Sequence, residues 1–96
     1  MSAYMVVDVR YDDLDWTQAY RRDVPAMIAA HGGRYLARSS PVERLEGAGD
    51  LPDTLAIVEF PTIAAARALL SSSEYQPYAR ARQAGARTQI YLLDGL

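Results

Sequence analysis

The 96-residue sequence contains no cysteine and no lysine. Without cysteine the chain can form no disulfide, no thiolate nucleophile, and no zinc or iron–sulfur site held by cysteine ligands. Without lysine it can form no Schiff base with a carbonyl compound and no Walker-type phosphate loop, which needs a glycine–lysine pair. These two absences exclude a large part of cofactor-dependent enzymology.

Histidine is almost absent as well, because His31 is the only one. A metal site built from several histidines would need more than one subunit. A Ser-His-Asp triad would have to use His31, yet the sequence has no G-x-S-x-G motif. The carboxylates of Asp12, Asp13 and Asp15 suit the start of a helix better than a metal ion. We therefore predict neither a metal nor a cofactor.

Charge and hydrophobicity narrow the range of partners. The formal net charge is −2, and there is no basic stripe with interleaved aromatic residues, which argues against nucleic acid as a partner. No apolar run approaches the roughly 20 residues that a membrane-spanning helix needs. The sequence therefore predicts one domain over residues 1–96 in a soluble, cytoplasmic protein that binds neither nucleic acid nor a membrane.

The periodicity of the apolar residues predicts the order β-α-β-β-α-β. The expected strands run from Ala3 to Tyr11, Arg34 to Ser40, Leu55 to Phe60 and Thr88 to Leu93. The expected helices run from Trp16 to His31, from Ile63 to Leu70 and, after a capping box of Ser73 and Gln76, from Glu74 to Ala84, with Arg82 on a solvated face. This order is typical of the ferredoxin-like α+β fold with a four-stranded antiparallel sheet.

One face of the predicted sheet is left without a cover. The two helical regions can cover the face that carries Met5 and Val58, but the opposite face is also apolar. Its apolar residues are Tyr4, Val6, Leu36, Leu55, Ile57, Tyr91 and Leu93. Such a surface is too apolar for water, and a second copy of the chain is the simplest cover. The sequence therefore predicts a face-to-face homodimer.

Strand alternation places five charged residues on this same second face. They are Asp8, Arg10, Arg34, Arg38 and Glu59. Charges among apolar side chains must be paired or must contact water or a ligand. They are either ion pairs of a dimer interface or the polar groups of a small-molecule pocket, and both interpretations stay open.

His31 also has two interpretations. It comes at the end of the first predicted helix, before Gly32 and Gly33, where an imidazole can satisfy free carbonyl groups and is favoured by the helix dipole. It is also the only side chain whose ordinary pKa lies near neutrality, which suits a general acid or base.

Four motifs resemble a known bacterial family, the domain of unknown function numbered 1330 (DUF1330). The motifs are His31-Gly32-Gly33-Arg34-Tyr35-Leu36-x-Arg38, Leu45-Glu46-Gly47, Glu59-Phe60-Pro61 and Ser73-x-Tyr75. The resemblance implies a ferredoxin-like subunit of the dimeric α+β barrel superfamily. That superfamily includes cofactor-free monooxygenases, muconolactone-type isomerases, polyketide cyclases and haem-using relatives. The chain departs from the family at Ser39-Ser40, where two glycines are common, and at Thr54, where arginine is common.

Three functions remain possible from the sequence. The first is a cofactor-independent cyclase, isomerase or monooxygenase that acts on a carbonyl- or enol-bearing metabolite, in a pocket between helices and sheet or inside the barrel. Its catalytic candidates are His31, Arg38 and Glu59, and its substrate-binding candidates are Tyr4, Asp8, Arg34 and Tyr91. The second is a non-catalytic small-molecule-binding protein, and the third is a purely structural dimer.

Overall fold

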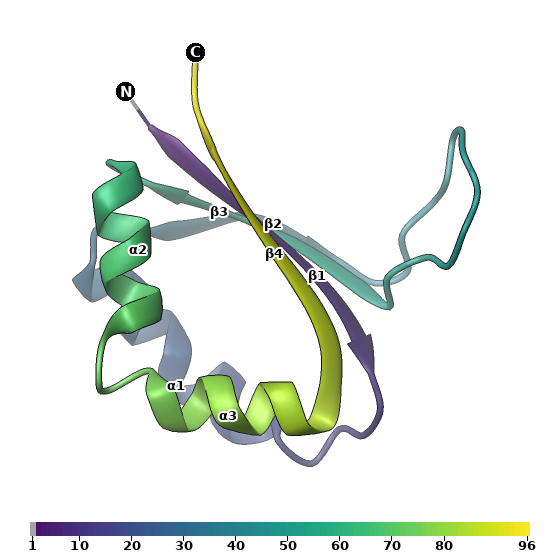
Figure 1. Cartoon of the computed structure of the whole chain (residues 1–96), viewed down its shortest axis with the longest axis horizontal. Coiled ribbons are helices and arrows are strands. Elements are labelled where there is room, and N and C mark those ends of the chain that lie inside the picture. Colours follow the sequence, from purple (N-terminus) through teal and green to yellow (C-terminus); the bar gives the residue numbers. More distant parts are fainter. Residues whose placement is uncertain (1) are drawn as a thin grey trace.

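The computed structural model describes residues 2–96. The elements follow in the order β1 (Ala3–Tyr11), α1 (Thr17–Ala30), β2 (Arg34–Ser39), β3 (Thr54–Phe60), α2 (Ile63–Ser71), α3 (Gln76–Gly85) and β4 (Ala86–Asp94). The strands form one sheet in the order β2-β3-β1-β4, and every neighbouring pair is antiparallel. The helices lie on one side of this sheet (Figure 1). The predicted ferredoxin-like α+β fold is confirmed.

The hydrophobic core lies between the helices and one face of the sheet. Along β3 burial alternates strictly, so that Val58 and Phe60 point toward the helices, and Met5 of β1 lies beside them in the register. Val24 and Ile28 of α1 and Leu69 of α2 close the core from the other side. This is the period of two expected for a strand with one buried face.

The ends of the helices differ in part from the prediction. Thr62 caps α2, since its hydroxyl accepts a hydrogen bond of 3.0 Å from the Ala65 amide. The capping box predicted for α3 is wrong: the helix begins at Gln76, and the Gln76 amide group donates to the carbonyl oxygens of Leu70 and Ser72 instead. This amide ties the loop between α2 and α3 to the end of α2. The Gln76 side chain therefore links the start of α3 to the end of α2, and no side chain caps α3.

A β-bulge in β2 changes which side chains face the helices. Arg34 lies opposite Glu59 and Tyr35 opposite Val58, but the register then shifts, so that Arg38 lies opposite Ala56. One extra residue in a bulge reverses the facing of every side chain that follows it. The prediction that Arg34 and Arg38 share a face is therefore wrong. Arg34 stays on the second face, and Arg38 lies on the helix face.

The second face of the sheet carries apolar side chains that no element of residues 2–96 covers. Tyr91 is 54% exposed and Leu93 is 48% exposed. Both lie beside β1, opposite Val6 and Tyr4 respectively. None of the helices in residues 2–96 is long and apolar enough to cross a membrane.

Helices α1 and α3 are joined by a hydrogen bond of 2.5 Å from the Tyr78 hydroxyl to the Asp23 carboxylate. Arg22 also donates to this carboxylate, at 2.9 Å. These hydrogen bonds, first that of Arg22 and then that of Tyr78, lower the pKa of Asp23 from 3.8 to about 2. Each of them favours the ionised form of the carboxylate.

We expect the stabilisation from this contact to depend on pH. Because the pKa of Asp23 is lower in the folded chain, its contribution is complete above pH 3.8 and is lost as the pH falls toward 2. Tyr78→Phe should therefore be less stable than the wild type near neutral pH, and the difference should shrink over that acid range. Urea unfolding at several pH values measures it. Tyr91→Phe, whose hydroxyl bonds only to Gln89 of its own strand, is the control and should show no such trend.

Candidate functional site

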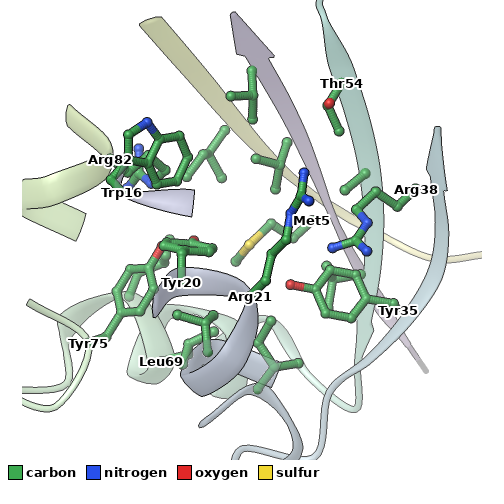
Figure 2. A pocket seen from close by; sticks show the side chains of 18 of the residues that line it. Met5, Trp16, Tyr20, Arg21, Tyr35, Arg38, Thr54, Leu69, Tyr75 and Arg82 are labelled. Atoms are coloured by element: carbon green, nitrogen blue, oxygen red, sulfur yellow. The ribbon is translucent and has the colours of Figure 1, made fainter. Parts of the chain in front are cut away.

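A cavity of about 80 Å³ lies between the helices and the sheet (Figure 2). One water molecule needs roughly 10–15 Å³ by the same measure, so the space suits a small organic molecule. Its walls are mostly apolar, with Met5 and Val58 from the sheet, Val24 from α1 and Leu69 from α2. An apolar cavity with a few polar groups is the usual form of a small-molecule site.

The charged groups of the cavity are all cationic. Arg21 of α1, Arg38 of β2 and Arg82 of α3 line it, and no aspartate, glutamate or histidine does. Only Arg82 is buried, so the positive potential of its guanidinium group is poorly screened, whereas Arg21 and Arg38 are exposed. The arrangement favours an anionic ligand, or one that becomes anionic during a reaction.

Arg82 is the most deeply placed of the three. The residue is 6% exposed, its Nε has no hydrogen-bond partner, and it joins none of the ion pairs formed within residues 2–96. A buried charge without a partner is costly and is unusual in a folded chain. An arginine in this position is an anion-binding candidate.

Two tyrosine hydroxyls lie at the same end of the cavity as Arg82 (Figure 2). The hydroxyls of Tyr20 and Tyr75 are hydrogen-bonded to each other. Burial, more than any other cause, raises the pKa of Tyr20 well above its usual range, and the positive charge of Arg82 acts in the opposite direction. Tyr20 is therefore a neutral phenol at physiological pH.

Trp16 forms the wall beside this end. Its indole ring meets the Tyr20 ring edge-on at 5.4 Å between centroids, and its Nε1 donates to the Asp13 carbonyl at 3.0 Å. Gly85 leaves room for the indole, since a Cβ at this position would come within 2.7 Å of the Trp16 Nε1. The indole ring is thus held by its hydrogen bond and fits closely against Gly85, which has no side chain.

The opposite end of the cavity carries Arg21, Tyr35 and Arg38 (Figure 2). The three residues are exposed at the surface, so this end is the mouth of the cavity. The Arg38 guanidinium carbon lies 5.8 Å from the centroid of the Tyr35 ring, a cation–π distance. Partial burial raises the pKa of Tyr35, and the charge of Arg38 opposes that shift.

Comparison with models of known protein families finds one that matches this chain. The family model described as "Domain of unknown function (DUF1330)" matches residues 2–96. The chain belongs to the DUF1330 family. The resemblance inferred from the motifs is thereby confirmed. No curated protein matches this chain.

Solved structures with the same fold show how this DUF1330 chain compares with other proteins. A protein of unknown function from Rhodopseudomonas palustris is 21% identical, with a TM-score of 0.84 over 99% of this chain and 82% of that one. A variant of SnoaB, a cofactor-independent oxygenase from Streptomyces nogalater, is 18% identical, with a TM-score of 0.70 over 98% of this chain and 92% of that one. A dimeric ferredoxin-like protein of unknown function from Jannaschia sp. is 13% identical, with a TM-score of 0.66 over 99% and 100%. At these identities the similarity establishes the fold alone.

The other residues singled out from the sequence lie outside the cavity of the DUF1330 chain. On the second face the Arg34 Nε donates to Glu59 at 2.9 Å, and this hydrogen bond is the main reason that the pKa of Glu59 is lowered. Tyr4, Asp8 and Tyr91 share that face by their register with Glu59, Leu55 and Val6. The structure therefore brings Arg34, Glu59 and Tyr4 together, away from Arg38.

His31 is held at the end of α1. Its Nδ1 lies 3.0 Å from the carbonyl oxygen of Met27, one turn earlier in the same helix. His31 is not among the residues that line the cavity. This contact is the helix-end arrangement that the sequence offered as one of two interpretations.

Sequence reasoning did not assign Tyr20, Tyr75 and Arg82 to a cavity, nor Arg21 at its mouth. Tyr75 was predicted only as a motif position and Tyr20 was not singled out, and the prediction that Arg82 is solvated is wrong because α3 turns this residue inward. The signal was present: Tyr75, Ala79 and Arg82 follow one another at helical spacing, and all three are buried. This spacing alone would have placed position 82 on the buried side of α3.

Proposed function

We propose that this chain is a homodimeric, cofactor-independent cytoplasmic enzyme that acts on a small carbonyl- or enol-bearing metabolite in the cavity between helices and sheet. The observation that carries the proposal is an apolar cavity lined by three arginines and by no carboxylate. A ketone with an acidic α-hydrogen gains negative charge on oxygen when that proton leaves. Guanidinium groups that are already in place stabilise the enolate and lower the barrier to its formation.

Oxygenation is the reaction that we favour for this enolate. The α-carbon of a methylene group loses a proton to a base, and the resulting carbanion adds O₂, which forms a C–O bond. After protonation the hydroperoxide loses water, because the remaining hydrogen on carbon leaves as the O–O bond breaks. The net change converts CH₂ and O₂ to C=O and H₂O, so no other oxidant is consumed. The fold similarity to SnoaB, a cofactor-independent oxygenase, supports this choice.

A non-catalytic binding protein is the second candidate. It is favoured by the fact that no aspartate, glutamate or histidine lines the cavity to serve as the base. A substrate of an oxygenase here must therefore be acidic enough to lose its proton to water or to a base that enters with the partner subunit or the substrate. 1,3-Dicarbonyl compounds, and ketones such as anthrone whose enol is aromatic, meet this condition and carry the methylene group that the reaction needs.

The homodimer is part of the same proposal. The uncovered Tyr91 and Leu93 support it, as does the strand β2, in which all six residues are exposed. The structural neighbour from Jannaschia sp. is described as dimeric. A second copy on this face would bury Arg34, Glu59 and Asp8 as interface groups.

Oxygen uptake tests the proposal. Purified protein is mixed with enolisable ketones of increasing size, namely 1,3-cyclohexanedione, 1,3-indanedione and anthrone, and O₂ consumption is followed with an electrode. We expect uptake faster than the uncatalysed reaction for at least one compound, with one ¹⁸O atom from ¹⁸O₂ in its ketone product by mass spectrometry. Binding without uptake or any other product would favour the non-catalytic candidate. Neither binding nor turnover across the panel would refute the proposal.

A further inference from the structure

The inner end of the cavity, which we define as Tyr20, Tyr75 and Arg82, has the properties of a site for a charged group. Tyr75 is 2% exposed and Arg82 is 6% exposed. All three residues line the cavity, and they come from α1, from the turn before α3 and from α3 itself. Separate elements thus bring their polar groups to one place.

The hydrogen-bonding capacity of this end exceeds what the described chain uses. The Nε–H of Arg82 has no acceptor in residues 2–96. The two tyrosine hydroxyls bond to each other, but they carry two hydrogens, and only one of these can lie between the two oxygens. The other hydrogen is left to donate elsewhere. The inner end therefore offers a cation and donors, with no carboxylate of the chain beside them.

We propose that this inner end binds the carboxylate of a cyclic carboxylic acid. The inference rests on the proposed function, and it specifies the substrate as an acid whose carbonyl or enol group lies toward Arg38. A carboxylate would supply two acceptor oxygens to the guanidinium group, the pairing that arginine makes best. It would also neutralise a buried charge that now has no partner.

The rest of the cavity fits the same molecule. Arg38 and Tyr35 lie at the opposite end, at the mouth (Figure 2). Met5 lies between the two ends (Figure 2), and most other residues that line the cavity, such as Val58, are apolar. A ligand that fills the cavity is therefore polar at both ends and apolar in the middle, as a ring with a carboxylate on one side and a carbonyl on the other would be.

Benzoate and benzamide test the site, because they have nearly the same shape and differ in charge. Trp16 is the only tryptophan and lies beside the inner end, so its fluorescence reports binding there, and calorimetry gives the affinities. We expect the wild type to bind benzoate about 10- to 100-fold more tightly than benzamide, as for a charge-assisted hydrogen bond in a buried site. Arg82→Gln should abolish this preference. Arg80→Gln, an exposed arginine of the same helix, should keep it.

Three results would overturn the inference: equal binding of the two probes by the wild type, no binding of either, or a preference that persists in Arg82→Gln and disappears in Arg38→Gln. If Arg82→Gln does not fold, ¹⁵N-labelled wild type replaces it, and benzoate must then shift the Arg82 Nε–H resonance while benzamide leaves it in place. Failure of the proposed function gives a different pattern, in which benzoate binds through Arg82 but no enolisable acid is turned over.

Discussion

Replacing Arg38 by methionine should lower the turnover of an enolisable substrate about 10²–10³-fold, the usual loss when one donor to a developing oxyanion is removed. The Arg38 guanidinium joins no ion pair of residues 2–96, and it lies over the face of the Tyr35 ring. Its removal therefore leaves no buried charge without a partner. We expect the melting temperature to stay close to that of the wild type, and kcat to fall more than KM rises.

Arg67→Met is the matched control for this experiment. Arg67 is an exposed arginine of α2 that does not line the cavity, so its loss should leave turnover unchanged. If Arg34→Met rather than Arg38→Met stops the reaction, the active site lies on the second face of the sheet, with the Arg34–Glu59 pair. Equal turnover in Arg38→Met and the wild type would remove Arg38 from the mechanism.

Arg34 and Arg38 show how far the facing of side chains can be predicted from the sequence of a strand. Alternation correctly places Met5 and Val58 on the core face and Ile57 on the other, because β1 and β3 pair without interruption. It fails at Arg38, because the register shifts between Tyr35 and Ala37. The strand Arg34–Ser39 contains no glycine or other turn residue that would indicate a β-bulge. A β-bulge depends on how two strands fit together, so one strand alone does not encode it.

The prediction that Arg82 faces solvent is wrong for a different reason. The sequence places Arg82 in line with Tyr75 and Ala79, because the three residues are spaced by four and three positions along the helix. An arginine is normally placed on the solvent side of such a stripe, because burial of an unpaired guanidinium is costly. Positions where this general rule fails are often functional, since a ligand can supply what the chain does not. The residue that sequence rules assign to solvent is thus the one that best defines the cavity.

If the proposed homodimer forms through the second face, Ile57→Asp should convert it to a monomer or to an aggregate. Ile57 is half-buried on the second face, where it lies opposite Val6. In a two-fold interface the substitution is present in both subunits, so two carboxylates would enter one apolar contact and repel each other. An obligate interface buries on the order of 2,000 Å² or more, and two unpaired charges within it would cause a large loss of affinity.

Light scattering coupled to size-exclusion chromatography measures this change at micromolar protein concentration. Ala68→Asp, an exposed position of α2 on the opposite layer, is the control and should remain dimeric. Because Ile57 points away from the core between helices and sheet, the far-UV circular dichroism of the Ile57→Asp variant should stay close to that of the wild type if it is monomeric. A wild type that is monomeric under these conditions would refute the dimer. An Ile57→Asp variant that stays dimeric would place the interface on another surface, and the apolar second face would then need a different cover.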